Sequence, residues 1–348
     1  MKKLLSVLLA LSMLAALPLL SSAEEEKVLN IFSWDGYVDY ASVIQPFEQQ
    51  TGIKVNYAPF STNDEMFKKL QENGASEYDL VIASDYILNT ARLEGLMLPL
   101  DKEQLPNFAN LDERFISQYF DPDNEYVVPY MSGIPLIVYN PDMVQIEIDG
   151  FEDLWDPSLA DSIGLIDDAR VSIGMVLLSM GQSMNTTDDA VLAQAKEKLF
   201  ALRENIHVLE YENLHNSLIS GDISVAYTFT PYVALALDAN PNLQVVWPKE
   251  GLGFGIDGAF IPANAPHPDN AHTFLNYLLD GQVAAVTAEW QYYCTPNAAA
   301  QEFLSDAYKN NPVFNGIYDR FGDAEYVMNL GADESKFQDI WTEFKLLF

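Results

Sequence analysis

Basic side chains are scarce in this sequence of 348 residues. There are 18 Lys and Arg against 51 Asp and Glu, which gives a formal net charge of −33 at pH 7. A protein that binds nucleic acid neutralises phosphates with Lys and Arg, so this composition argues against nucleic acid as a partner. A cationic partner suits the acidic field better, although most of the carboxylates need do no more than keep the protein soluble.

Cysteine and the signatures of common enzymes are also lacking. Cys294 is the only cysteine, which rules out an internal disulfide and leaves too few thiols for a cysteine metal site. No G-x-S-x-G, H-E-x-x-H or P-loop pattern occurs. Residues 253–258 match G-x-G-x-x-G, but a strand pattern ending at Pro262 follows them, not a helix beneath a phosphate. Prolines beside His267, with His272 five residues on, indicate a surface loop and a helix start, so we expect neither a metal nor another cofactor.

Long apolar runs are absent except at the N-terminus. Two lysines precede an apolar run from Leu4 to Leu20, and small residues occupy the −3 and −1 positions of a cleavage site after Ala23. This pattern predicts a secretory signal peptide over residues 1–23. The run is short for a membrane span and contains Pro18, and no cysteine near the cleavage site offers a point of lipid attachment. We therefore expect a periplasmic or otherwise extracytoplasmic protein.

The sequence of 348 residues is long enough for two domains, and 49% of it is apolar by residue type, which is enough to bury a core. Its first part alternates apolar runs with helix-like stretches, which predicts an α/β unit with parallel strands. The order is an apolar run at 28–32, a helix around 43–47, a run at 53–57, a helix after Asn63 and a run at 79–83. In such sheets ligands bind at the carboxyl ends of strands. Residues 33–37 and 84–86 follow two of these strands and are therefore candidate ligand residues.

The alternation resumes after a strand-like crossing at 133–140. Residues 163–166 form an apolar run that ends at Asp167 and Asp168, and a helix and the run 223–229 follow. A stretch dense in Gly and Pro, 248–262, precedes a possible return to the first unit. Excursions of this kind produce two discontinuous lobes with a cleft between them.

Aromatic rings and carboxylates recur together at the predicted strand ends. Trp34 adjoins Asp35, and Asp85 adjoins Tyr86. Each ring alone is more typical of core packing, and each Asp of a helix cap. Together they favour a site for a polyamine, because ring faces attract ammonium groups and cover methylenes while carboxylates accept charge-assisted hydrogen bonds from the same ammonium groups.

At these residues the chain resembles the spermidine/putrescine type of substrate-binding protein that serves bacterial ABC importers. The resemblance covers essentially the whole mature chain. It rests on the segments 78–81, 120–124, 128–130, 167–170, 246–251, 261–265 and 295–297. It implies a two-lobed α/β fold of the type II periplasmic binding proteins, whose discontinuous lobes close on the ligand by hinge motion without catalysis.

The resemblance also implies an organisation and a set of partners. Lobe 1 is expected to comprise residues 28–132 and 256–302, and lobe 2 residues 133–255 and 303–348. The partners implied are a polyamine such as spermidine or putrescine and the membrane permease of an ABC importer, with the binding protein itself a monomer.

The ligand residues that follow from the resemblance and from the strand-end pattern form one set. They are Trp34, Asp35, Tyr37, Ser84, Asp85, Tyr86, Asp168, Phe229, Tyr232, Asp257 and Tyr293. Asp168 and Asp257 are the carboxylates expected to contribute most. The chain departs from the family at Gly36 and Val171, where relatives commonly have an acidic residue, and at Phe229 and Gly255, where they have Trp. Asp35 and Asp85 stand where relatives carry small or hydroxyl residues, so the charge is expected to have moved within the site.

Two alternatives remain open. Tyr292 and Tyr293 are similar to the paired phenolates with which some proteins of this architecture hold ferric ion, so the same fold is able to bind another cation or iron. A secreted hydrolase that uses two acidic residues is supported only by the abundance of Asp and Glu.

Overall fold

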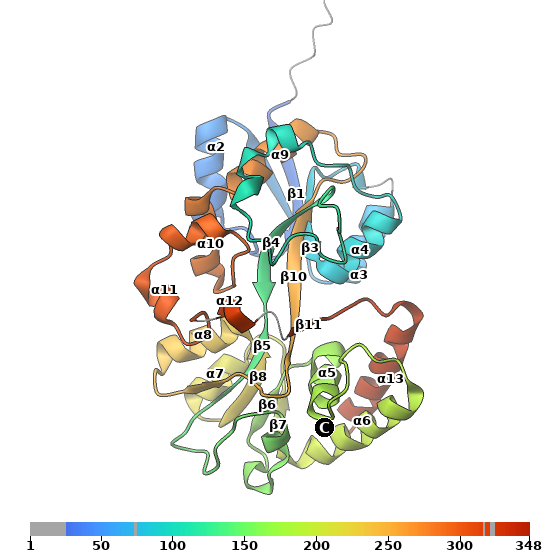
Figure 1. Ribbon diagram of the computed structural model, residues 1–348, viewed down its shortest axis with the longest axis vertical. Helices are drawn as coiled ribbons and strands as arrows, with labels where there is room; N and C mark the ends of the chain where they lie inside the picture. Colours follow the sequence, from blue (N-terminus) through green and yellow to red (C-terminus); the bar gives the residue numbers. More distant parts are fainter. Residues whose placement is uncertain (1–25, 73–74, 316, 321–323) are drawn as a thin grey trace, which may run out of the picture.

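The computed structural model describes residues 26–72, 75–315, 317–320 and 324–348. The predicted signal peptide, 1–23, lies outside these residues. Within the described part of the chain, no helix is both long and apolar enough to pass through a lipid bilayer. Two lobes follow one another along the long axis of the molecule, each with its own β-sheet, and strands cross from one to the other (Figure 1).

The first sheet contains the strands predicted from the alternating N-terminal pattern. Its order is β11-β10-β3-β1-β2, and β4 pairs with β10 on a separate branch. The strands are β1 (Val28–Trp34), β2 (Lys54–Phe60), β3 (Leu80–Ser84), β4 (Val127–Gly133), β10 (Leu252–Phe260) and β11 (Ala324–Tyr326). As predicted, β1 pairs in parallel with β2 and β3. The strand β10 runs antiparallel to β3 and β4, so its residues return the chain to this sheet.

The second sheet has the order β7-β6-β8-β5-β9. Its strands are β5 (Pro135–Tyr139), β6 (Ile163–Leu165), β7 (Ile206–Leu209), β8 (Val225–Phe229) and β9 (Gln244–Val246). The strand β6 is parallel to β7 and β8, so the carboxyl ends of these three strands meet at one edge of the sheet. This edge carries Asp168, which follows β6, and Phe229, which ends β8.

Helices flank both sheets (Figure 1). The α-helices are α2 (Gln45–Thr51), α3 (Asn63–Gln71), α4 (Asp85–Leu93), α5 (Ala169–Ser179), α6 (Asp189–Ala201), α7 (Leu214–Ser220), α8 (Thr230–Ala239), α9 (Pro268–Leu278), α10 (Gly281–Gln291), α11 (Asp306–Asn310), α12 (Ile317–Arg320) and α13 (Glu334–Lys345). A π-helical turn, η1 (Tyr40–Ile44), precedes α2. Short 3-10 turns occupy 102–104, 106–110, 152–155, 157–159, 202–205, 298–302 and 331–333.

Three connections join the lobes. The first runs from β4 to β5 through Ile134, the second from β9 to β10, and the third from β11 to α13. The Gly- and Pro-dense stretch 248–262 is largely the long strand β10 and not a loop, because its glycines allow close packing. A Cβ atom on Gly253 would lie 2.5 Å from Met184 Cε, and one on Gly258 would lie 2.5 Å from Val127 Cγ1.

The C-terminal segment reaches the second lobe only at its end. Tyr308 donates a hydrogen bond to the Tyr293 carbonyl, and the Tyr318 ring packs against Phe115 at 6.2 Å between centroids, so this stretch lies against the first lobe. Trp341 and Phe344 of α13 then enter the core of the second lobe. The sequence interpretation had assigned all of 303–348 to lobe 2.

Candidate functional site

The turn after β1 carries Trp34, Asp35 and Tyr37, and the hydroxyl groups of two tyrosines hold its backbone in place. The Tyr57 hydroxyl donates to the Trp34 carbonyl, and the Tyr130 hydroxyl donates to the Tyr37 carbonyl at 3.0 Å. The Trp34 ring is partly buried and packs on Phe60 with 4.6 Å between ring centroids. The Asp35 side chain is exposed.

Asp257 lies opposite Ser84 in the register between β10 and β3. Both of its carboxylate oxygens accept hydrogen bonds: Oδ1 from the Ser84 hydroxyl at 2.8 Å, and Oδ2 from the Tyr37 hydroxyl. Burial raises the pKa of Asp257, and these two hydrogen bonds oppose the rise. Because an oxygen of a carboxylate has two lone pairs, Asp257 retains the capacity to accept from a ligand.

Tyr293 completes the aromatic wall of the first lobe. Its ring meets Tyr37 edge-on at 6.0 Å between centroids, and burial followed by the Asp257 charge raises its pKa. The ring lies directly on the backbone of the β4 crossing, since a Cβ atom on Gly133 would be 2.6 Å from Tyr293 Cε1. Tyr292 points elsewhere and donates a hydrogen bond to Asp238 Oδ2 at 2.5 Å. The two neighbouring phenols therefore do not converge as a pair.

Asp85 and Tyr86 begin α4 directly after β3. Asp85 is 2% exposed, and its pKa is raised well above the ordinary value, first by burial and also by the Asp257 charge, while hydrogen bonds from the Ile256 and Tyr86 amides lower it. The Tyr86 hydroxyl accepts a hydrogen bond from Asn63 Nδ2 at 2.5 Å. Both residues thus lie at the strand end that the sequence pattern identified.

In the second lobe, Asp167 and Asp168 have different roles, as expected for neighbours on an extended segment. Asp167 accepts hydrogen bonds from Trp341 Nε1 at 2.8 Å and from Lys345 Nζ at 3.1 Å. Asp168 is the N-cap of α5 and accepts from the Val171 amide at 2.8 Å. Burial raises the pKa of Asp168, although the amides of the first turn and the Arg170 charge favour its ionised form.

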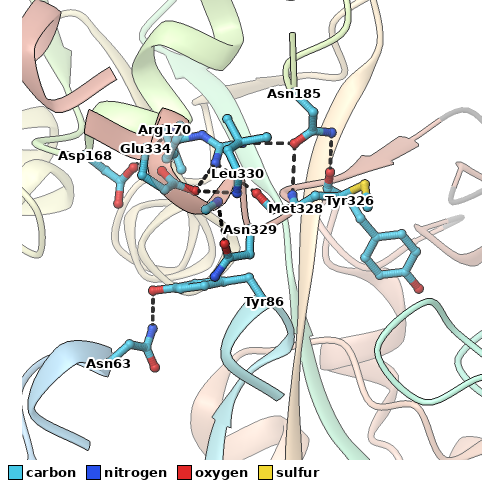
Figure 2. A network of polar contacts seen from close by, with 12 residues as sticks. Asn63, Tyr86, Asp168, Arg170, Asn185, Tyr326, Met328, Asn329, Leu330 and Glu334 are labelled. Atoms are coloured by element: carbon cyan, nitrogen blue, oxygen red, sulfur yellow. Dashed lines mark hydrogen bonds and ion pairs between the residues drawn. The ribbon is translucent and has the colours of Figure 1, made fainter. Parts of the chain in front are cut away.

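Arg170 connects the helix that Asp168 caps to the third inter-lobe connection (Figure 2). Its guanidinium group donates to the Met328 carbonyl at 2.9 Å, to Asn185 Oδ1 at 2.9 Å and to Glu334 Oε1 at 2.5 Å. Asn185 in turn donates to the Tyr326 carbonyl at 2.7 Å. The connection that leaves β11 is therefore fixed to α5 immediately beside the Asp168 cap.

Tyr211, which the sequence interpretation missed, lies among the candidate residues. It follows β7, and its ring lies 6.1 Å from that of Phe229. The Glu210 carboxylate accepts from the amides of Tyr211 and Glu212 at 3.1 and 3.4 Å, which fixes the shape of this loop. The signal that identifies Tyr211 is the one used for the others, because it too follows the carboxyl end of a parallel strand.

The electrostatic environment of Tyr211 shows that candidate residues of both lobes face one region. Tyr211 is 44% exposed as a whole residue, but its pKa is raised, first by burial and then by Asp168, Tyr232, Asp257 and Tyr86, in that order. Asp168 and Tyr232 belong to the second lobe, and Asp257 and Tyr86 belong to the first lobe. Tyr232 itself stacks on His215 with 5.5 Å between ring centroids. The structure therefore places Asp168 and Asp257 near the same tyrosine.

The described residues contain no group of three or more His, Cys, Asp and Glu side chains arranged to hold a metal ion. His267 contacts the Asp79 carboxylate at 3.1 Å, and His272 is buried, where its Nε2 accepts from the Asp101 amide at 2.9 Å. The helix α9 begins at Pro268, as the prolines predicted, and His272 lies within it. The His272 ring holds the backbone of the neighbouring loop at Asp101.

Comparison with known proteins gives concordant results. Residues 42–316 match the family described as bacterial extracellular solute-binding protein. The chain is 34% identical over 346 residues to the spermidine/putrescine-binding periplasmic protein of Escherichia coli K12, covering 99% of each chain. It is 32% identical over 368 residues to the putrescine-binding periplasmic protein PotF of the same organism, covering 99% of this chain and 98% of that protein.

A solved structure has the same fold. It is the spermidine/putrescine ABC transporter substrate-binding protein PotD of Streptococcus pneumoniae, with a TM-score of 0.82 and 32% identity. The alignment covers 92% of this chain and 98% of that one.

Proposed function

The chain belongs to the family of bacterial extracellular solute-binding proteins, and from this premise we propose that it captures a polyamine such as spermidine or putrescine between its lobes and delivers it to the permease of an ABC importer. The relatives named for spermidine and putrescine align over nearly the full length of the chain. Their names also support a periplasmic location, to which the N-terminal sequence would direct the protein.

One observation carries the proposal: Asp168 from one lobe and Asp257 from the other lie in the surroundings of a single tyrosine, Tyr211. A linear polyamine alternates ammonium groups with methylenes. Carboxylates bind the first through charge-assisted hydrogen bonds, and ring faces cover the second while attracting the neighbouring charges. Closure of the two lobes would replace the hydration shell of such a ligand with these groups.

The ligand-binding set that we propose contains the eleven residues expected from the sequence, with Tyr211 added. Asp35 is the weakest member, because its side chain is exposed. We further propose that the protein acts as a monomer without catalytic activity, and that lobe motion occurs about the connections near 133–135, 247–251 and 327–333. Among the described residues, the first lobe would then comprise 28–132, 252–315, 317–320 and 324–326, and the second lobe 136–246 and 334–348.

The direct test is to identify what the protein carries. Native mass spectrometry of protein purified without refolding should show a mass increment equal to one polyamine, which is lost on dialysis under mild denaturation. Isothermal titration of the emptied protein with spermidine and putrescine should then show one binding site. Absence of heat with both polyamines, together with a different copurified mass, would refute the proposal.

A further inference from the structure

Asp85 is a buried carboxyl group without a cationic partner. Its Oδ1 accepts from the Tyr86 amide at 2.7 Å and its Oδ2 from the Ile256 amide at 3.2 Å. Among the ion pairs of the described residues, none involves Asp85. A carboxylate that is buried in this way is costly unless a positive charge compensates it.

The structure leaves open space next to this carboxyl group, at Gly255. Gly255 and Asp257 are alternate residues of β10, so both face the same side of the strand. A Cβ atom on Gly255 would meet only one described atom within 4 Å, and that atom is Asp85 Oδ2 at 3.9 Å. Gly255 itself is partly exposed. The side of β10 that carries Asp257 therefore has an opening whose nearest wall is a carboxylate oxygen.

Two tyrosine hydroxyl groups lie behind Asp85. The rings of Tyr119 and Tyr326 are 5.4 Å apart, and after burial it is the Asp85 charge that raises the pKa of each phenol most. The Tyr326 hydroxyl is buried and has no hydrogen-bond partner among the described residues. The Arg170 charge acts on Tyr119, whose pKa it lowers, and Arg170 is already bound to Glu334. The surroundings of Asp85 therefore offer oxygen atoms but no free positive charge.

We propose that Asp85 and Asp257 form a paired-carboxylate subsite on the first lobe that takes two ammonium groups of one ligand, and that the missing side chain at Gly255 gives the ligand access to Asp85. This inference rests on the proposed function and names the ligand class more closely. Residues two apart on a strand lie roughly 7 Å apart, so the opening at Gly255, which borders Asp85, and the Asp257 position are separated by a distance that a short aliphatic diamine spans. The ligand is an amine with at least two ammonium groups joined by a short alkyl chain.

The pairing of the two carboxyl groups explains why the ligand needs more than one ammonium group. The two carboxyl groups interact, and the Asp257 charge contributes to the raised pKa of Asp85. The Asp257 charge therefore disfavours ionisation of Asp85 in the free protein, because like charges disfavour each other. A ligand with two ammonium groups would compensate both carboxylates. The other groups that face Asp85 are Tyr119 and Tyr326, which stay protonated.

The subsite is tested by isothermal titration of two variants with putrescine, spermidine and N-acetylputrescine, which has the length of the diamine but only one ammonium group. Asp85→Asn removes the charge. Gly255→Val keeps the carboxylate and fills the opening, and the first atom it adds makes only an ordinary contact. Glu302→Gln, on an exposed 3-10 turn, is the control for loss of one negative charge.

Both site variants should bind putrescine and spermidine at least about tenfold more weakly than the wild type, the loss expected for one charge-assisted hydrogen bond. Their affinity for N-acetylputrescine should equal that of the wild type. If the wild type shows no measurable binding of N-acetylputrescine, the variants should show none either. Polyamine affinities within about threefold of wild type in both variants would overturn the subsite while leaving the proposed function intact. Failure of the wild type to bind either polyamine would instead refute the proposed function. Gly255→Val decides the matter if Asp85→Asn does not fold.

Discussion

At the scale of single residues, the carboxylates of the candidate site differ in how strongly the fold itself uses them. Asp168 caps α5, and Asp85 accepts two backbone amides, so both serve the fold as well as a ligand. Asp257 accepts only from side-chain hydroxyls, those of Ser84 and Tyr37. Its substitution therefore separates binding from folding best.

We expect Asp257→Asn to lower spermidine affinity about a hundredfold or more, because removal of one member of a buried ion pair costs about 3–5 kcal/mol. The amide keeps an oxygen that can accept from Ser84, so the melting temperature should change little. Titration calorimetry measures the first quantity and differential scanning calorimetry the second. Unchanged spermidine affinity in a folded variant would remove Asp257 from the site.

Trp34 is expected to contribute through its ring face. Trp34→Ala should weaken polyamine binding by roughly 1–2 kcal/mol, or about five- to thirtyfold, the range for a partly desolvated cation–π contact. Trp290→Ala is the matched control, since Trp290 is 47% exposed on α10. If both variants bind spermidine equally well, Trp34 has only the structural role of packing on Phe60.

At the scale of elements, the sequence predicted the strands and their ends better than the connections. The run Leu80–Ala83 is apolar throughout and contains the β-branched Val81 and Ile82, so the strand and the candidate residues after it were identified together. The strand β7 was missed because it has only four residues, Ile206–Leu209, one of them an exposed histidine. Tyr211 was missed with it. The crossing strand β10 was also obscured, since its glycines signal a loop until their close packing partners are known.

The third connection depends on Arg170, which is 8% exposed. Arg170→Met leaves Glu334 and the Met328 carbonyl without their guanidinium partner. We expect the free energy of unfolding to fall by on the order of 3 kcal/mol, as for other broken buried pairs. Urea denaturation of the wild type and of the variant measures this difference in the free energy of unfolding.

The control for Arg170 is Lys249→Met, because the Lys249–Asp149 pair is more than half exposed on both sides. Such a pair contributes at most about 1 kcal/mol. The double variant Arg170→Met/Glu334→Gln should recover part of the loss, since it no longer leaves a charge without its partner. Equal effects of Arg170→Met and Lys249→Met would show that Arg170 does not anchor the connection.

At the scale of the whole molecule, the acidic groups of the two lobes act together on stability. The pKa values of Asp85, Asp168 and Asp257 are all raised in the folded protein, each chiefly by burial. A carboxyl group with a raised pKa stabilises the fold below its unfolded pKa and loses that contribution as the pH rises through its folded pKa. Glu48 and Asp112, whose pKa values are lowered first by hydrogen bonds from Lys54 and Arg114, act in the opposite sense at lower pH.

We therefore expect the ligand-free protein to be more stable at about pH 5 than at about pH 8, because carboxyl groups with raised pKa values lose their protons above the ordinary carboxyl range, whereas those with lowered values are already ionised there. Spermidine should raise the melting temperature more at the higher pH, because only ionised carboxylates hold its ammonium groups. Thermal unfolding across this range, with and without spermidine, measures both trends. In Asp257→Asn one of the buried carboxyl groups no longer titrates, so both pH trends should be smaller than in the wild type. The control Glu302→Gln should show the same trends as the wild type. A ligand-induced shift that is equal at both pH values would mean that spermidine is not held by the buried carboxylates where the two lobes meet.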